Sequence, residues 1–366
     1  MAIRLSALVL MLCPAGCVNV EGPSRIPPPQ EFAALAPAAA GALRDGGPVA
    51  PLENLGAVGG GRFGPWMAIA ETIGKDMFLG SRGGVLLAAR DVLVRPGEPT
   101  VLTAVLRGER LRGLPGHTLA FSVEGRPVGE AVTDAEGVAI TTHRFPRAGT
   151  YTVRVRWKAG PFDLSFLESA PLLAAVRPAA ARMIVVDLDG TVVESRLVAA
   201  MLSPDGGRPV PGAAETLTRL TDRGWEVVYL TARWEQLHVR NRRWLDDHGF
   251  PRGPVLEGRG GGDLAGGDEK RETLRVLRQK FVNLAAGVGD KATDAEAYAA
   301  GGLAPYLLVR PRWDKPKKLR ELADEIRACP AGTQVVEDWA QVEAGLTTGR
   351  VFDRAATLRR LAAAGG

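Results

Sequence analysis

A continuous apolar run, Met183 to Val186, leads directly into two aspartates, Asp187 and Asp189. A strand without polar alternation is typical of a parallel sheet that helices cover on both faces. Carboxylates two residues apart in an extended chain project to the same side, so a cation or a proton must relieve their repulsion. The run therefore predicts a buried central strand with a charged site at its carboxyl end.

The C-terminal half continues this alternation of strands and helices. Further strands are expected at 225–230, 254–256, 284–288, 306–309 and 335–339. Helices are expected at 211–224, 234–248, 269–280, 295–300, 315–328 and 352–364. This order predicts an α/β fold, a doubly wound parallel sheet over 180–345, followed by a C-terminal helix in 346–366. In such sheets, binding and catalytic groups gather at the carboxyl ends of the strands.

The preceding region, 85–160, changes to short runs with a period of two residues. The runs lie at 98–107, 117–124, 137–142 and 150–157, with Gly and Pro between them. Regular short strands of this kind predict a small β-sandwich. The phrase from Val132 to Ala139 resembles the strand-turn-strand of bacterial immunoglobulin-like domains. No catalytic grouping is visible here, so we expect a spacer or binding module.

Polar groups follow four of the expected strand ends and helix starts in the α/β region. In chain order they are Asp187, Asp189, Thr231, Lys270, Asp290 and Asp294. Lys280, near the far end of the same expected helix, is the alternative to Lys270. Any one of these residues is common at such a position, but their order and placement together are informative.

This order resembles the four motifs of the haloacid-dehalogenase-like phosphohydrolases over about residues 182–310. The resemblance implies a magnesium-dependent phosphatase in which Asp187 is the nucleophile and forms an aspartyl-phosphate. It implies that Asp189 protonates the leaving oxygen and then activates water. The implied substrate-binding residues are Thr231, Lys270, Gly190 and Arg233. The implied ligands of Mg²⁺ are Asp187, the carbonyl of Asp189, Asp290 and Asp294, the last in a supporting role.

Only short segments are available for a cap domain over this site, 191–208 and 251–268. We therefore expect a capless and open site, which suits large or surface-bound substrates better than small metabolites.

Several phrases resemble the lipin and LNS2 group, namely 209–212, 228–233, 244–253 and 294–298. Some LNS2 members lack the first aspartates and only bind phosphatidate, whereas Asp187 and Asp189 are both present here. The resemblance thus implies hydrolysis of phosphatidate or a related lipid phosphate. Two alternatives stay open. One is a periplasmic phosphatase for nucleotides or nucleic-acid ends, and the other is a non-catalytic phosphatidate-binding module.

The N-terminus is typical of an export signal. Residues 1–12 carry one positive charge and an apolar run too short to span a bilayer. Residues 14–17, Pro-Ala-Gly-Cys, resemble the lipobox of bacterial lipoproteins. The resemblance implies cleavage after residue 16, acylation of Cys17 and a membrane-anchored protein facing the periplasm, with Val18 favouring the outer membrane. A plain secretory leader and no export at all are the alternatives.

Between leader and sandwich, 17–64 is rich in Pro, Gly and Ala and is expected to be a tether. Residues 65–84 follow as an amphipathic helix with a linker, which packs on a neighbouring domain or lies on a membrane.

Composition argues against several other classes of protein. With Cys13 and Cys17 in the leader and Cys329 alone beyond it, no disulfide framework is available. The net charge is +5, yet no basic cluster with interleaved aromatics supports nucleic-acid binding. The four histidines, His117, His143, His238 and His248, are scattered, and we expect ordinary surface or helix residues.

Overall fold

The computed structural model describes residues 81–82, 85–108, 112–194, 207–258 and 267–365. The predicted signal peptide, the tether, Cys17 and the helix within 65–84 all lie outside these described residues. Of the two segments considered for a cap, 195–206 and 259–266 also lie outside them. Among the described residues, no helix combines the length and the apolarity needed to cross a membrane.

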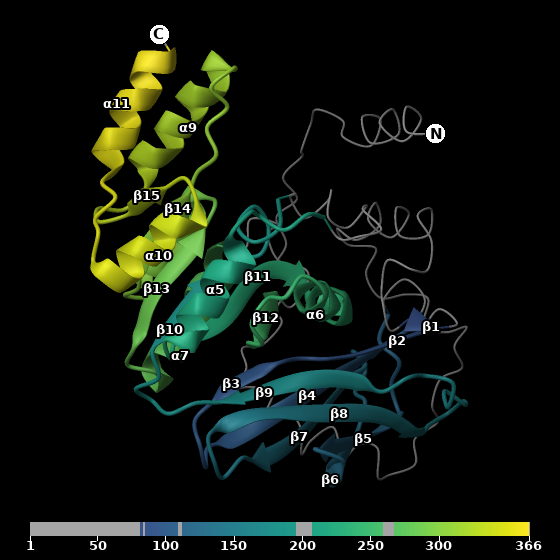
Figure 1. Cartoon of the computed structure of the whole chain (residues 1–366). Coiled ribbons are helices and arrows are strands. Elements are labelled where there is room, and N and C mark those ends of the chain that lie inside the picture. The colour runs from purple at the N-terminus through teal and green to yellow at the C-terminus, as the bar shows by residue number, and fades with distance from the viewer. Residues whose placement is uncertain (1–80, 83–84, 109–111, 195–206, 259–266, 366) are drawn as a thin grey trace, which may run out of the picture. The chain divides into compact units, whose positions relative to one another are not determined.

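A β-sandwich forms the first part of the described chain and is built of two sheets (Figure 1). The four-stranded sheet has the order β1 (Ser81–Arg82), β2 (Val85–Ala89), β4 (Pro99–Arg107) and β7 (Val138–Arg144). The five-stranded sheet has the order β3 (Val92–Val94), β9 (Ala170–Val176), β8 (Gly149–Ala159), β5 (Thr118–Val123) and β6 (Arg126–Val132). The predicted sandwich is thereby confirmed.

The sandwich extends past the expected end at residue 160 because β9 pairs antiparallel with β8. β9 lacks the alternation that marks the other strands, since both of its faces are covered. Leu172 and Ala174 pack inside the sandwich. Leu173 and Ala175 pack instead against residues of the α/β region. A search for alternating residues therefore passes over this strand.

The α/β region contains a six-stranded parallel sheet, as the sequence predicts. Its order is β12 (Val255–Gly258), β11 (Glu226–Trp234), β10 (Met183–Val186), β13 (Leu284–Gly289), β14 (Ala304–Leu308) and β15 (Gln334–Val336). The strand order reverses at β10, which pairs with β11 on one side and β13 on the other. All four residues of β10 are buried, as expected for a central strand.

Helices cover both faces of this sheet (Figure 1). On one face, α5 (Ala213–Asp222) and α10 (Trp339–Thr348) share a core with β10, to which α6 (His238–Asp247) adds Trp244. On the other face, α7 (Gly267–Lys280) and α8 (Ala292–Ala300) pack through Leu274 and Tyr298. α9 (Pro316–Ala328) and α11 (Arg354–Gly365) pack together beside β14. The doubly wound architecture is confirmed.

The β-sandwich and the α/β region share a buried polar cluster around His238. The His238 ring lies between two carboxylates, with Nε2 3.2 Å from Asp91 Oδ1 and Nδ1 3.0 Å from Glu257 Oε2. His238 begins α6, but it is 1% exposed and doubly paired, so it is not the ordinary residue that the sequence suggested. Burial lowers the pKa of His238, but Asp91 and Glu257 outweigh it and raise the pKa to about 10.

This shift predicts how stability depends on pH. The pKa of His238 rises from 6.5 to about 10 on folding, so the imidazolium stabilises the folded chain fully below pH 6.5. The contribution is lost as the pH rises through about 10. We expect the thermal midpoint of the full chain to decrease as the pH rises from 6.5 to about 10. His238→Gln should be less stable than the wild type at neutral pH, and its thermal midpoint should decrease less over the same pH range. Circular dichroism at stepped pH measures both.

The matched control is His143→Gln, which removes a sandwich histidine whose ring packs against Phe145. This variant should keep the alkaline slope of the wild type. An equal slope in His238→Gln and the wild type would contradict the prediction.

Candidate active site

The candidate site lies at the carboxyl ends of β10, β11 and β13, where the strand order reverses. A sharp turn follows β10, in which the amides of Val192 and Val193 both donate to the carbonyl of Leu188. Gly190 in this turn has a φ of 80°, which favours glycine. A Cβ at Gly190 would lie 1.9 Å from Asp290 Oδ2, so the turn and the end of β13 are in direct contact.

Lys270 joins two of the predicted carboxylates. Its Nζ donates to Asp187 Oδ1 and to Asp294 Oδ1, each at 2.6 Å. All three side chains are buried, so the contacts are strong and the charges are screened little. The alternative, Lys280, pairs instead with Glu98 of the sandwich. The structure thus brings Lys270, and not Lys280, to the first aspartate.

Asp290 supplies an oxygen that lacks a partner. Its Oδ1 is buried and accepts no hydrogen bond within the described chain. Ligand atoms of Asp187, Asp290 and Asp294 lie within 4.8 Å of one another. A buried carboxylate oxygen without a donor is costly unless a cation satisfies it. The converging oxygens therefore fit a divalent metal ion.

The electrostatics of this cluster are unfavourable for so many ionised carboxylates. Burial raises the pKa of Asp187 to about 7, with Lys270 opposing the rise and Asp294 adding to it. Burial and Asp294 likewise raise the pKa of Asp290 to about 6. Burial alone would lower the pKa of Lys270, but Asp187 and Asp294 raise it well above its ordinary value. A bound cation would relieve the repulsion among the carboxylates.

β11 contributes Thr231 and Arg233. Thr231 is buried, and its Oγ1 accepts the backbone N–H of Arg233 at 3.1 Å. Arg233 forms a bidentate ion pair with Asp189, with Nε 3.0 Å from Oδ2 and Nη2 2.8 Å from Oδ1. The Asp189 side chain thus points to Arg233, while Asp187 points to Lys270. The two aspartates therefore have different charged partners, Arg233 for Asp189 and Lys270 for Asp187.

A family comparison adds to this geometry. Residues 184–307 match the model of the LNS2 domain of PITM 1-3. This is an LNS2-like domain. The match confirms the predicted resemblance of this region to LNS2 domains, and the four motifs of the predicted haloacid-dehalogenase-like pattern all lie within it. No curated protein matches the chain significantly.

Solved structures with similar parts have low identity to this chain. An octulosonate 8-phosphate phosphatase, YrbI, from Haemophilus influenzae, solved with cobalt, is 16% identical, covers 50% of this chain and 98% of its own, and has a TM-score of 0.31. The CARDB domain of PF1109 from Pyrococcus furiosus is 12% identical, with 25% and 85% coverage and a TM-score of 0.20. The adhesin InvE from Yersinia pseudotuberculosis is 21% identical, with 29% and 32% coverage and a TM-score of 0.22.

Two residues that the sequence did not single out also contact residues of the site. Arg310, just after β14, donates to the carbonyl of Gly190. Asn241 on α6 accepts from Arg233 Nη1 at 2.7 Å. A basic residue after a strand end was a usable signal for Arg310. Asn241 gave none, because its role depends on where α6 packs.

The contact between Gly190 and Asp290 predicts a selective effect of one methyl group. Gly190→Ala should abolish binding of divalent metal and phosphatase activity, because the new Cβ would occupy the place of Asp290 Oδ2. The control is Gly224→Ala, since Gly224 has a nearly equal φ of 81° with nothing within 4 Å of a Cβ. The control should cost only backbone strain, about 1–2 kcal/mol. Metal titration by calorimetry and phosphate release test both variants, and equal behaviour would contradict the prediction.

Proposed function

We propose that this chain is a magnesium-dependent phosphomonoester hydrolase that works through an aspartyl-phosphate on phosphatidate or a related lipid phosphate. The observation that carries the proposal is the meeting of Asp187, Lys270 and the unpartnered oxygen of Asp290 at the reversal point of the sheet. A nucleophile, a cation for the phosphoryl oxygens and a site for a metal are the parts that phosphoryl transfer requires.

Asp187, Asp290 and the backbone carbonyl of Asp189 would hold the magnesium ion, with Asp294 supporting it. Carboxylate and carbonyl oxygens are the ligands that this hard cation prefers. When bound, the ion would neutralise charge on the phosphoryl oxygens.

The residues of the site divide the reaction between them. An oxygen of Asp187 attacks phosphorus as the bond to the leaving oxygen breaks, and Asp189 gives that oxygen a proton. Lys270 Nζ and Thr231 Oγ1 bind the phosphoryl oxygens in this proposal. In the second step Asp189 takes a proton from a water that attacks phosphorus, which releases phosphate and restores Asp187.

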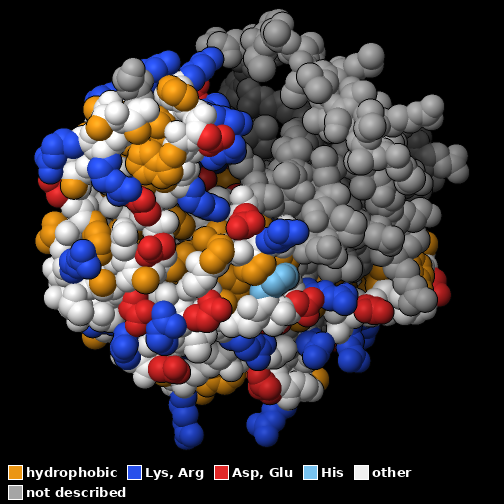
Figure 2. Space-filling model, turned by 45° about the horizontal axis from the view of Figure 1, so that its top comes forward, with side chains coloured by type: hydrophobic (Ala, Val, Ile, Leu, Met, Phe, Trp, Pro, Cys, Tyr) orange, Lys and Arg blue, Asp and Glu red, His pale blue; other side chains and the backbone are white. Residues whose placement is uncertain are grey.

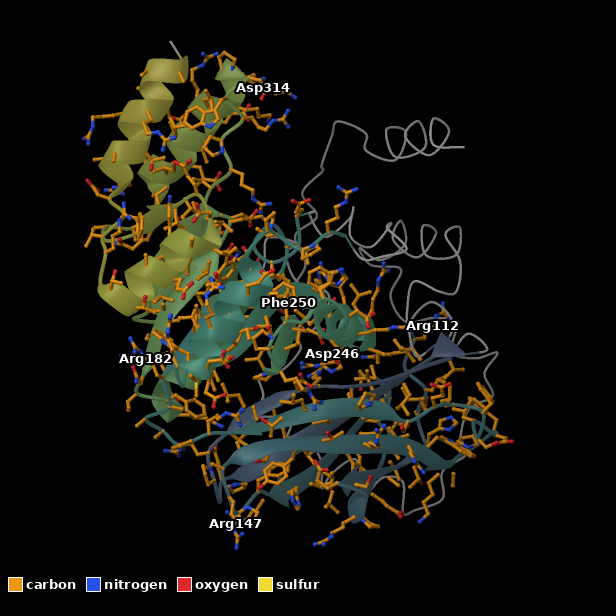
Figure 3. All side chains as sticks on the ribbon, viewed as in Figure 1. Arg112, Arg147, Arg182, Asp246, Phe250 and Asp314 are labelled. Atoms are coloured by element: carbon orange, nitrogen blue, oxygen red, sulfur yellow. The ribbon has the colours of Figure 1, made fainter. Side chains whose placement is uncertain are left out.

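The charge of the segment that follows β14 supports an anionic surface as the place of the substrate. Residues 310–320 contain six basic residues against one acidic residue, a net charge of +5. This segment starts at Arg310 and includes Trp313, which is 43% exposed. Asp314, labelled in Figure 3, marks it beside the start of α9. Tryptophan and basic residues are typical of a membrane interface.

Figure 2 shows apolar side chains in small groups among Lys, Arg, Asp and Glu side chains on the described surface. We further propose that Cys17 is acylated and that the protein is anchored to a periplasmic membrane face, preferably the outer membrane. The anchor would keep the LNS2-like domain close to lipid substrates. The short segments at the two cap positions fit this proposal, since an open site admits a surface-bound substrate.

The proposed function predicts magnesium-dependent release of phosphate from phosphatidate in mixed micelles by the full chain. EDTA should abolish the release, and so should Asp187→Asn, because the nucleophile is lost. The matched control is Asp247→Asn, which changes an exposed carboxylate that pairs with Arg243 on α6. This control should keep full activity. Phosphate is measured in parallel with a panel of nucleotides.

A variant with Lys315→Glu and Lys317→Glu separates the lipid surface from the chemistry. It should lower release from anionic vesicles at least tenfold and leave release from soluble phosphate esters unchanged. Release from nucleotides alone would overturn the lipid substrate and keep the reaction. No release from any ester, with the chain still binding phosphatidate vesicles, would replace the enzyme by a binding module.

A further inference from the structure

The β-sandwich contributes one fully buried carboxylate, Asp91, to the LNS2-like domain. Asp91 lies between β2 and β3, and its Oδ1 accepts the amide of Leu173 at 2.6 Å within the sandwich. Its Oδ2 accepts the amide of Val255 at 2.8 Å, at the start of β12. Arg242 of α6 also pairs with Oδ2. One side chain therefore fixes the sandwich to a strand and a helix of the catalytic domain.

A continuous line of buried and partly buried contacts leads from Asp91 towards the site. Asp91 pairs with His238, and His238 pairs with Glu257 on β12. Glu257 Oε1 accepts from Asn241 Nδ2 at 2.6 Å. Asn241 Oδ1 in turn accepts from Arg233 Nη1 at 2.7 Å, and Arg233 holds both oxygens of Asp189. Five contacts thus join a sandwich carboxylate to the proposed acid and base.

We propose that Asp91, His238 and Glu257 are positioning residues for Asp189, so that the β-sandwich is part of the catalytic apparatus. This inference rests on the proposed function, because it concerns the proton that Asp189 gives to the leaving oxygen. The three residues act through Asn241 and Arg233 and touch neither the phosphoryl group nor the metal site.

The line can affect Asp189 because hydrogen bonds to both Asp189 and Asn241 fix the orientation of the Arg233 guanidinium group. Its Nε and Nη2 hold Asp189 and its Nη1 holds Asn241, so the planar group is fixed on two sides. The charges along the line alternate in sign from Asp91 to His238 to Glu257. A buried charge that loses its partner is costly, so loss of one member moves its neighbours. Displacement of a reacting group by about 1 Å can cost about a hundredfold in rate.

A second ion-pair cluster at the same interface provides the matched control. Glu235 is 1% exposed and pairs with Arg90 of the sandwich. Its Oε1 also lies 3.5 Å from Nη2 of Arg107, which belongs to the sandwich as well. Like Glu257 it has a buried side chain, but its ion pairs join it to Arg90 and Arg107 of the sandwich and not to Asn241. Glu235→Gln therefore weakens the interface without interrupting the line.

The kinetic test compares two esters on the full chain, glycerol 2-phosphate and p-nitrophenyl phosphate. The alkoxide of glycerol needs a proton from Asp189 to leave, whereas p-nitrophenolate leaves with little assistance. Asp91→Asn and Glu257→Gln should each lower kcat/KM for glycerol 2-phosphate by about tenfold or more. The value for p-nitrophenyl phosphate should change less than threefold, which is small against the general-acid effect. Glu235→Gln should lower both values equally or not at all.

An equal loss for both esters in Asp91→Asn would mean that the sandwich only supports the fold, and it would overturn the inference. Asn241→Leu is the second variant, because it cuts the line inside the LNS2-like domain and spares the contacts of Asp91. The same leaving-group dependence is expected from it, and its absence would also overturn the inference.

A spectroscopic test keeps the inference apart from the proposed function. In the ¹⁵N-arginine-labelled full chain, the Nε–H of Arg233 is identified by its loss in Arg233→Lys. Its exchange with solvent should be about tenfold faster in Asp91→Asn and unchanged in Glu235→Gln, because Nε–H donates to Asp189. Unchanged exchange in Asp91→Asn would overturn the inference even in an inactive protein. Faster exchange with no phosphate release would overturn the function alone.

Discussion

The repulsion among buried carboxylates at the end of β10 is the constraint on which the site depends. Asp187, Asp290 and Asp294 converge there, and one lysine, Lys270, joins two of them. One positive charge does not balance three carboxylates, of which Asp187 and Asp294 are buried and Asp290 is half-buried. Burial and the neighbouring carboxylates therefore raise the pKa of Asp187 and Asp290. The arrangement is costly as it stands, and a bound divalent cation would offset that cost. The electrostatic repulsion in the site therefore favours the binding of a cation.

The sheet topology allows this crowding. Because the strand order reverses at β10, the connections leaving β11 and β13 run to opposite faces of the sheet. Side chains from three strand ends can therefore meet without a loop passing between them. Gly190 makes the meeting closer still, since any side chain there would collide with Asp290. The turn after β10 is consequently shaped by the residue that follows β13.

The β-sandwich depends on the LNS2-like domain for part of its burial. β9 packs one face into the sandwich and the other against the α/β core, so neither region is covered without the other. Asp91 adds buried ion pairs to this apolar contact. A spacer would need only the apolar contact, because charged groups that are removed from water usually contribute little net stability. Their presence along a line to Asp189 favours a role in the reaction.

The sequence by itself determined the parallel sheet, the order of the four motifs and the position of Asp187 at the carboxyl end of the central strand. These follow from local signals, since an apolar strand that ends in polar residues fixes where those residues point. Only the tertiary structure decided that Arg233 pairs with Asp189, that Asn241 supports it, and that the sandwich reaches the site through Asp91. Such pairs join residues far apart in the chain, and no spacing or periodicity records which buried charges will meet when two domains pack.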